Sequence, residues 1–331
     1  MSHPLNIGLY LLSPSEPAGI ERAAWAEDHG YSTVWVPDGE GKMHALTLAG
    51  ALAASTSTIR IAIGIVPVFT HTPAVLAAAA LTLSHLAPGR IVMGLGASAE
   101  GMIEGWHGIP YQKPLTRVRE TTLALQAMLA GERSDFAGET LTTKGFKLLP
   151  PLKAPVPVYL AALRPKMLEL AGELADGVVM HLAPMSLLPG MLASVAAGAK
   201  RSGRELSSLD IACRFNVVMA KNKAEAMEPA REFIQRYFTA PIYRRFFEWC
   251  GFEAEAEAFE KGFREKDRDA TRAAITDRVV ETFCIVGAPE ECREQVAAFH
   301  AAGITSPAIN ACTTDPQVAQ RIFEAFLPEH F

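Results

Sequence analysis

The sequence has few cysteines, and they form no paired motif. In 331 residues there are five, which are Cys213, Cys250, Cys284, Cys292 and Cys312. An odd number of widely spaced cysteines without a Cys-x-x-Cys pair is typical of reduced thiols. We therefore expect a cytoplasmic protein without a disulfide framework.

Basic clusters and membrane-spanning runs are also missing. The net charge is -5 with no concentrated group of Lys and Arg, which argues against a nucleic-acid surface. The most apolar helical stretch, residues 74–87, is interrupted by Thr82, Ser84 and His85 and is too short to cross a bilayer. No basic region precedes the apolar segment 5–12, so export is not expected. These features predict small-molecule partners, without nucleic acid or a membrane.

The motifs of several hydrolytic and metal-dependent classes are absent. The chain has no His-Glu-x-x-His sequence and no Gly-x-Ser-x-Gly elbow. The fragment Gly94-x-Gly96 lacks the third glycine of a dinucleotide fingerprint and does not indicate a Rossmann domain. We therefore predict no metal site and consider an organic cofactor.

What is present is a regular alternation of apolar runs and Ala-rich helical patterns. The strand-like runs are residues 6–12, 33–36, 59–66, 91–95, 156–161, 177–181, 211–219 and 307–311. The helical patterns between them are 20–29, 45–54, 74–86, 118–130, 167–175 and 288–302. Eight strands alternating with helices predict a parallel (β/α)8 barrel as one domain over residues 1–331, with a doubly wound sheet as the alternative.

Two long segments interrupt the alternation. Residues 131–155 contain Phe136-Ala-Gly-Glu-Thr140, a hairpin-turn pattern, and we interpret them as an insertion after the fourth strand. Residues 237–277 mix aromatic with charged side chains and predict a helical insertion after the seventh strand. We expect these aromatic residues to pack against the barrel or a second subunit, with the wall of a substrate pocket as the alternative.

Polar side chains follow most of the predicted strands. In a (β/α)8 barrel the carboxyl ends of the strands meet at one face, which holds the active site. The residues at these positions are Asp38, Glu40, His44, Thr70, His71, Ser98, Glu100, Trp106, His107, Arg164, Lys166 and His181. We expect this cluster to form the functional site, with Trp106 and His107 in a loop above it.

The turn after the fifth strand suits a phosphate group. Pro165 fits the first turn of a helix, whose free N–H groups attract anions, and Arg164 and Lys166 add positive charge. We predict phosphate binding at this turn.

Other charged residues are expected to be structural. Arg90 begins the fourth strand, which places it at the opposite end of the barrel. Arg117, Arg119 and Glu120 open a helix, where we expect local ion pairs.

Seven segments carry a resemblance to a known family. They are residues 30–38, 88–96, 117–120, 146–150, 157–162, 175–177 and 286–290. In these segments the sequence resembles the bacterial luciferase-like superfamily, particularly its branch of oxidoreductases that use the deazaflavin coenzyme F420. The resemblance implies a TIM-like (β/α)8 barrel, usually a homodimer, with the flavin or deazaflavin ring at the carboxyl ends of the strands.

The resemblance also implies a set of cofactor-binding residues. Asp38 matches an acidic residue near the ring, and residues 63–67 match a bulge that often contains a non-prolyl cis peptide bond behind it. With Lys166 and His181, which come from their positions at the strand ends, the complete predicted set is Asp38, Ile63, Gly64, Val66, Gly96, Ala97, Ser98, Ala162, Leu163, Arg164, Lys166 and His181.

The predicted activity is hydride transfer between F420 and an unidentified organic substrate, with the hydride chemistry belonging to the cofactor. Glu100, His44 and His71 are the candidates for proton transfer. In several deazaflavin enzymes a histidine directly follows the acidic residue, where this chain has Gly39, and a glutamate lies one residue before the position of Glu100. Two alternatives remain, an FMN-dependent luciferase-like monooxygenase and a non-catalytic flavin-binding protein.

Overall fold

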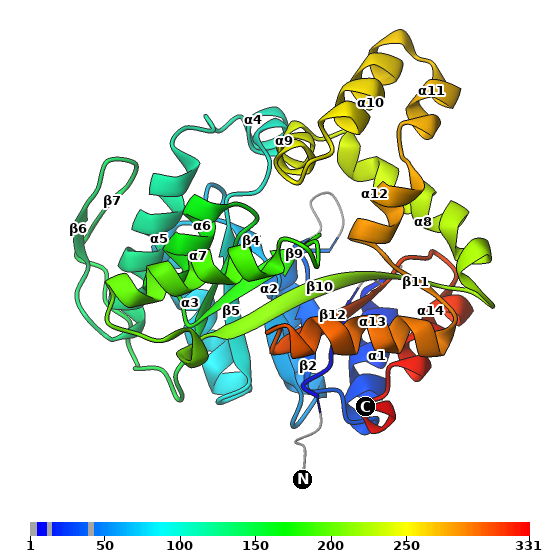
Figure 1. Ribbon diagram of the computed structural model, residues 1–331. Helices are drawn as coiled ribbons and strands as arrows, with labels where there is room; N and C mark the ends of the chain where they lie inside the picture. The colour runs from blue at the N-terminus through cyan, green and yellow to red at the C-terminus, as the bar shows by residue number, and fades with distance from the viewer. Residues whose placement is uncertain (1–4, 12–14, 39–42) are drawn as a thin grey trace.

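A closed parallel barrel forms the centre of the molecule. The structure is a computed structural model and describes residues 5–11, 15–38 and 43–331. Within these residues, the eight barrel strands in order are β1 (Gly8–Tyr10), β2 (Thr33–Val36), β3 (Arg60–Ile63), β5 (Ile91–Gly96), β8 (Val158–Ala161), β9 (Gly177–His181), β10 (Asp210–Met219) and β12 (Ser306–Ala311). Pairing of β12 with β1 closes the barrel, which confirms the predicted (β/α)8 fold (Figure 1).

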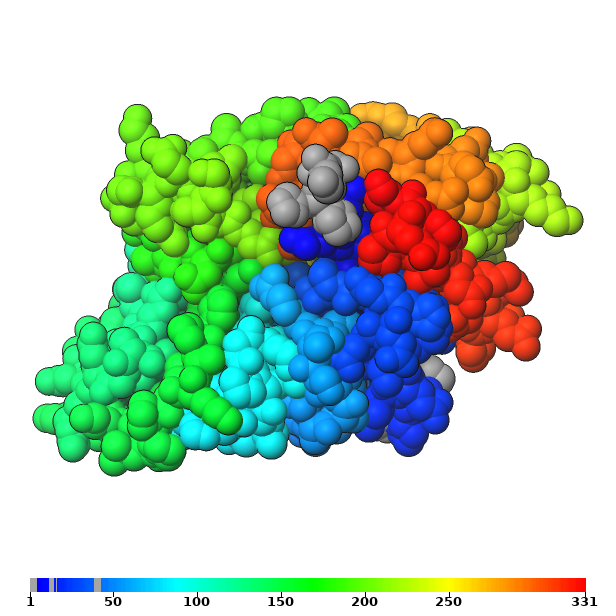
Figure 2. Space-filling model, turned by 90° about the horizontal axis from the view of Figure 1, so that it is seen from below, coloured from blue at the N-terminus to red at the C-terminus, as the bar shows by residue number. Residues whose placement is uncertain are grey.

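Helices surround the barrel on the outside (Figure 1). They are α1 (Glu16–Asp28), α2 (Ala45–Ser55), α3 (Pro73–Leu86), α5 (Pro114–Leu129), α6 (Pro165–Leu174), α7 (Leu188–Arg201), α13 (Pro289–Ala301) and α14 (Pro316–Ala325). Many of them carry proline in the first turn. A backbone N–H at this position would have no acceptor within the helix, so the N–H that proline lacks costs no hydrogen bond. Seen from below, the first helix (blue) and the last (red) are neighbours (Figure 2), and the Arg22 guanidinium of α1 donates to Gln320 of α14.

The barrel interior is packed with side chains. Alternate strand residues point inward, and a cluster of Tyr10, Trp35, Ala62, Val92, Tyr159, Ala212 and Ala308 fills the middle. At the amino ends of the strands, Arg60 donates to the Tyr159 hydroxyl (3.1 Å), which donates to Asp210 (2.7 Å). The charged side chains of Arg60 and Asp210 are therefore partnered at this end of the barrel. The pocket of the barrel lies at the other end, where the strands finish.

The third predicted strand is two strands. β3 ends at Ile63, and β4 (Val66–Pro67) continues beside β5 after two residues. The peptide bond between Gly64 and Ile65 is cis, as the family resemblance predicted. The Tyr10 hydroxyl donates to the Gly64 carbonyl (2.7 Å), which fixes this bulge to β1.

Arg90 has a structural role, as predicted. Its guanidinium donates to the carbonyl oxygens of Ala53 (3.2 Å), Thr56 (2.9 Å) and Ile59 (2.9 Å). These bonds tie the start of β5 to the end of α2.

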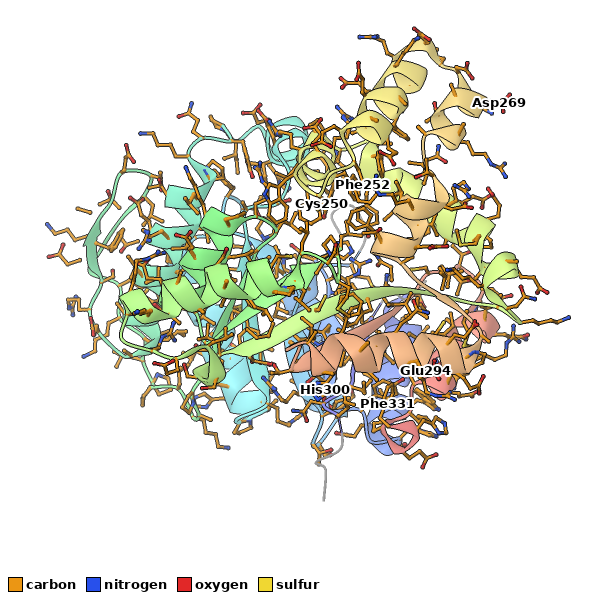
Figure 3. All side chains as sticks on the ribbon, in the orientation of Figure 1. Cys250, Phe252, Asp269, Glu294, His300 and Phe331 are labelled. Carbon is orange, nitrogen blue, oxygen red and sulfur yellow. The ribbon has the colours of Figure 1, made fainter. Side chains whose placement is uncertain are left out.

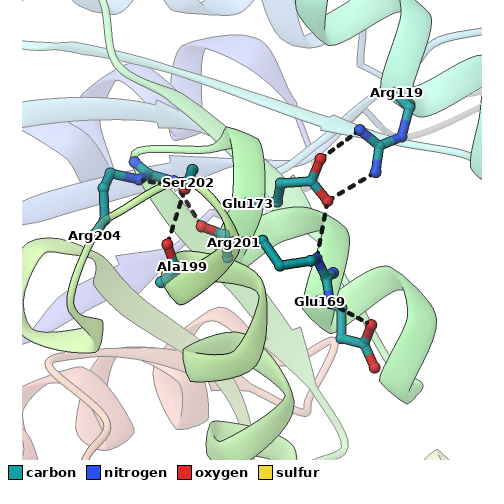
Figure 4. A network of polar contacts seen from close by, with 8 residues as sticks. Arg119, Glu169, Glu173, Ala199, Arg201, Ser202 and Arg204 are labelled. Carbon is teal, nitrogen blue, oxygen red and sulfur yellow. Dashed lines mark hydrogen bonds and ion pairs between the residues drawn. The ribbon is translucent and has the colours of Figure 1, made fainter.

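The prediction of local ion pairs at the start of α5 is correct only in part, because Arg119 pairs with a different helix. Arg119 pairs with Glu173 of α6 at 2.7 and 2.9 Å, within a network that continues through Arg201 to Glu169 (Figure 4). The Glu120 carboxylate accepts hydrogen bonds from backbone N–H groups of the neighbouring hairpin. These side chains face other elements because α5 packs between α3, α6 and the hairpin, so their partners lie far away in the sequence.

Both predicted insertions are present. The first contains the antiparallel hairpin of β6 (Asp135–Ala137) and β7 (Thr142–Lys144). The second is helical, as predicted, and consists of α8 (Lys223–Phe238), α9 (Pro241–Trp249), α10 (Glu253–Glu265), α11 (Arg268–Ala273) and α12 (Asp277–Phe283). It ends in β11 (Ile285–Gly287), a strand that pairs with β10 outside the barrel circle.

The aromatic residues of the second insertion form a core of their own. Phe246, Phe247 and Phe259 are fully buried in a cluster with residues of α8, α12 and β11. Phe252, labelled in Figure 3 beside Cys250, lies at the start of α10 with its ring 5.1 Å from that of Phe283. Most of the aromatic residues in the predicted insertion therefore pack against one another within it.

Candidate active site

A pocket of about 880 Å³ opens at the carboxyl ends of the barrel strands. Its walls come from the segments after β2, β3, β5 and β8, from residues within β9 and β10, and from α4 (Glu100–His107) and α9. Figure 1 shows α4 and α9 side by side above this end of the barrel. The position is the one at which (β/α)8 barrels hold their ligands.

Most of the predicted cofactor residues meet at this pocket. Those that line it are Asp38, Gly64, Gly96, Ala97, Ser98, Ala162, Leu163, Arg164, Lys166 and His181. Ile63 and Val66 do not line it, because their side chains are fully buried in the main core outside the barrel. The residues between them, Gly64 and Ile65, line the pocket.

Two glycines of β5 allow the bulge to pass close to that strand. A Cβ at Gly94 would lie 2.0 Å from the carbonyl oxygen of Ile63, and one at Gly96 would lie 2.7 Å from the Ile65 side chain. The close approach that these glycines permit is therefore to the neighbouring strand, and Gly96 also contributes to the pocket wall.

The turn before α6 has the features expected of a phosphate site. The helix has Arg164 as its N-cap, Pro165 in its first turn and no capping side chain. Among the described residues no side chain accepts from its first free N–H groups, and the exposed Arg164 and Lys166 flank them at the pocket wall.

Asp38 joins the pocket to the start of α2. Its carboxylate lines the pocket and accepts a hydrogen bond from the Ala45 N–H (3.0 Å). The neighbouring predicted positions Gly39 and Glu40 lie outside the described residues.

The three proton-transfer candidates lie outside the pocket lining. Glu100 is exposed in the first turn of α4, and His44 is exposed as the N-cap of α2. His71 is buried, with its Nε2 3.5 Å from the His44 Nε2 and its Nδ1 3.0 Å from the Thr70 hydroxyl oxygen. Burial lowers the pKa of His71, which favours the neutral ring.

Trp106 and His107 lie in a helix, so their placement in a loop is wrong. They form the last turn of α4, and the Trp106 side chain is 59% exposed. Gly101 and Gly105 weaken the helical pattern of this segment, whereas the buried Ile103 anchors it. The helix contributes Met102 to the pocket.

The sequence reasoning missed Arg214. This residue lies on β10, lines the pocket and places its guanidinium carbon 4.2 Å from the centre of the Tyr10 ring. Its Nη2 donates to the Tyr237 hydroxyl (3.3 Å). The available signal was the polar spacing of Arg214 and Asn216 within an apolar strand.

His181 lies beside Arg214 in the barrel. Burial, reinforced by the charge of Arg214, lowers the pKa of His181 well below its usual value. Its Nε2 lies 3.1 Å from the Asn216 amide nitrogen, and the Asn216 carbonyl oxygen accepts from Asn310 (2.9 Å). This network fixes a neutral imidazole at the pocket wall.

The described part of the chain holds no group of three or more His, Cys, Asp and Glu side chains arranged for a metal ion. None of its helices combines the length and the apolar character needed to cross a membrane.

Comparisons with known proteins identify the family. The model of the luciferase-like monooxygenase family matches residues 13–306. A 5,10-methylenetetrahydromethanopterin reductase of Methanolobus tindarius is 29% identical over 297 residues, covering 88% of this chain and 90% of the relative. An F420-dependent glucose-6-phosphate dehydrogenase of Rhodococcus erythropolis is 28% identical over 325 residues, covering 92% and 90%.

A solved structure shares the same fold. The coenzyme F420-dependent tetrahydromethanopterin reductase of Methanopyrus kandleri superimposes with a TM-score of 0.83 at 22% identity, and the match covers 98% of each chain. Together with the extent of the family match, this establishes that the chain belongs to the luciferase-like monooxygenase family and is an oxidoreductase of the luciferase-like class.

Proposed function

We propose that the chain binds coenzyme F420 in this pocket and transfers hydride between the deazaflavin ring and an organic substrate. One observation carries the proposal. A single pocket connects the cis bulge at Gly64 and Ile65 with the cationic turn at Arg164 and Lys166. The bulge therefore gives the pocket a wall for a planar ring, and the cationic turn gives it a site for a phosphate. The names of the relatives described above support F420 over FMN.

The residues of the pocket would hold the cofactor in a defined orientation. The backbone of Gly64 and Ile65 would support the ring, and Gly96, Ala97 and Ser98 would flank the ring and its side chain. The bound cofactor supplies the hydride chemistry. Asp38 would lie near the ring, with its carboxylate oriented by the N–H of Ala45.

Further residues would bind the phosphate tail and deliver a proton. Arg164, Lys166 and the start of α6 would hold the phosphate, with Ala162 and Leu163 beside the tail. Glu100, His44 and His71 remain the proposed proton donors. Because none of them lines the pocket, a proton from these residues would travel through water.

The test is a titration of the apoprotein with F420 and with FMN, followed by cofactor fluorescence. Arg164→Ala should weaken F420 binding roughly tenfold or more and change turnover at saturation much less, because the phosphate is remote from the reacting atoms. Lys200→Ala is the control, since Lys200 is an exposed cation at the end of α7 outside the pocket. Unchanged affinity in Arg164→Ala would show that the phosphate lies elsewhere.

FMN is the second candidate because the matching family is named for monooxygenases. Binding of FMN alone, with oxygen consumption by the reduced complex, would replace the deazaflavin proposal. Binding of either cofactor without turnover on a broad substrate panel would favour a non-catalytic flavin-binding protein.

We further propose that the enzyme is a homodimer.

A further inference from the structure

The pocket has a charge opposite to that of the whole chain. The net charge of the chain is -5, but the described pocket lining contains three cations, Arg164, Lys166 and Arg214, and one carboxylate, Asp38. The proposed function assigns Arg164 and Lys166 to the cofactor phosphate. It leaves Arg214 without a partner of opposite charge.

Arg214 is surrounded by neutral groups. Its Nε is buried without a hydrogen-bond partner among the described residues, and its Nη2 donates to the Tyr237 hydroxyl. The titratable groups that interact electrostatically with the Arg214 guanidinium include Tyr237, Tyr10 and Cys312. Burial raises the pKa of each of these three, so they are uncharged at neutral pH.

Arg60 provides a contrast, because its partly exposed side chain has a carboxylate partner. Arg60, at the amino ends of the strands, lies 3.9 Å from the Asp210 carboxylate. Within the described part of the chain, Arg214 has no such ion pair. A guanidinium cannot lose its proton at neutral pH, so burial without a counter-ion is unfavourable until a ligand supplies the anion.

The geometry of Arg214 suits an oxyanion. Its guanidinium lies over the Tyr10 ring, which holds the planar group in one orientation. An arginine fixed in this way can donate two parallel hydrogen bonds to a carboxylate or phosphate.

Arg214 also lies opposite the proposed ring site. In the closed strand order, β10 is four strands from β3 in either direction, so Arg214 and the bulge at Gly64 face each other across the barrel mouth. Resting on the proposed function for the position of the ring, we propose that the substrate carries an oxyanion group, which Arg214 binds while the reacting carbon faces the ring.

The experiment measures anion binding to the cofactor-loaded protein by calorimetry. Acetate and inorganic phosphate are the two probes, at constant ionic strength maintained with chloride, and they distinguish a carboxylate from a phosphate site. We expect one of them to bind, and Arg214→Met to weaken that binding by at least about tenfold. Cofactor affinity should stay within roughly threefold of the parent value.

Arg164→Ala separates the two cationic sites. It should weaken cofactor binding and leave anion binding to the loaded protein unchanged. If Arg214→Met weakens cofactor binding as strongly as Arg164→Ala, Arg214 belongs to the cofactor site and the proposal is wrong. Absence of binding by both probes to the parent protein also overturns it.

Failure of the proposed function would be visible separately. If neither F420 nor FMN binds, the same anion titration is performed on the apoprotein. Loss of anion binding in Arg214→Met, with retention in Arg164→Ala, would then support the oxyanion site even though the cofactor assignment had failed.

Thermal unfolding distinguishes a ligand-binding role from a structural one. Arg214→Met removes an unpaired buried charge and should leave the Tm unchanged or higher. Arg60→Met removes a partly exposed pair with Asp210 and a hydrogen bond to Tyr159, and should lower the Tm by a small amount. An equal fall in both variants would make Arg214 a structural residue and overturn the proposal.

If Arg214→Met does not fold, Arg214→Lys keeps the charge without the planar guanidinium, and we expect weaker anion binding than in the parent protein. Unchanged anion binding in Arg214→Lys would contradict recognition of the anion by two parallel hydrogen bonds from the guanidinium.

Discussion

At the scale of the residue, Glu27 shows how a single carboxylate connects two elements. It lies on α1 and accepts hydrogen bonds from the backbone N–H groups of Ser57 (2.8 Å), Thr58 (2.5 Å) and Ile59 (2.9 Å) at the start of β3. Burial opposes ionisation, but these hydrogen bonds outweigh it and lower the pKa of Glu27 from 4.5 to about 2.

Glu27→Gln should therefore reduce stability in a pH-dependent way. The folded protein favours the ionised carboxylate, so its contribution is complete above the unfolded pKa of 4.5 and is lost as the pH falls toward 2. We expect a loss of about 1 kcal/mol at pH 7, because the group is partly exposed to solvent. Urea unfolding at several pH values measures this difference.

Glu21→Gln is the matched control, since Glu21 is exposed on the same helix. The difference between the parent protein and Glu27→Gln should shrink as the pH falls. A difference that remains constant down to pH 3 would contradict the role of the ionised carboxylate.

At the scale of the element, the contact between the cis bulge and β5 depends on Gly94. A methyl group at this position would lie 2.0 Å from the Ile63 carbonyl oxygen, in a strand that is fully buried. We expect Gly94→Ala to lower stability by about 3 kcal/mol, because backbone atoms of β3 would have to move. Thermal unfolding measures this loss.

Gly101→Ala provides the opposite case. Gly101 lies in α4, is exposed and has no neighbouring atom within 4 Å of the added Cβ. This change should raise stability by about 0.5 to 1 kcal/mol, because alanine loses less conformational entropy in a helix. Equal effects of the two substitutions would show that the bulge does not require glycine at β5.

The strands could be predicted from the sequence because they are apolar runs separated by helices. All eight barrel strands lie within or within one residue of the predicted runs. The break in the third run could not be derived from periodicity, because residues 59–66 are apolar throughout apart from Arg60 and Gly64. Only the family resemblance pointed to a cis bond there.

Among the helices that were not predicted, α4 and α7 were missed for a local reason. α7 begins with Leu188-Pro-Gly190, and α4 contains two glycines in eight residues. Proline and glycine lower the helical signal, although proline is favourable in a first turn and burial of Ile103 stabilises α4. Tertiary packing therefore decided the conformation of both segments.

Arg214 was missed because its direction depends on the barrel. A polar residue within an apolar strand is compatible with either face, and only the register with β9 and β12 turns Arg214 toward the pocket. The cluster at the carboxyl ends could be predicted, whereas the depth of each side chain could not. His44, His71 and Glu100 are in the expected segments but outside the pocket lining.

At the scale of the whole molecule, two apolar cores meet along β10 and β11. Val217 and Ile285 belong to the main core, and the next residues, Val218 and Val286, belong to the core of the second insertion. This alternation follows from the twofold periodicity of a strand. The insertion that supplies Tyr243 and Trp249 to the pocket is thereby packed onto the same strand that carries Arg214.

The proposed homodimer is a prediction at this scale. The helix α3 exposes Val75 (52%) and Leu86 (47%), and its neighbour α5 exposes Leu123 (37%). We propose that these three side chains lie in the contact between the two subunits. We expect light scattering to give twice the mass of one chain, and Val75→Asp to give the mass of one.

Phe263→Asp is the control for this surface. Phe263 is also an exposed apolar residue (56%), but it lies on α10, in the part of the insertion that projects away from the barrel (Figure 1). This variant should keep the doubled mass. A parent protein with the mass of one chain would contradict the dimer.

The positively charged pocket within a negatively charged molecule has a consequence for work in solution. Charges on the outer surface are screened strongly at physiological ionic strength, whereas charges inside a cavity are screened much less. Dissolved phosphate or sulfate can therefore occupy the arginine and lysine positions of the pocket even in a buffered salt solution. Buffers made of these ions would compete with the natural ligands, and a buffer of bulky zwitterions would leave the pocket accessible.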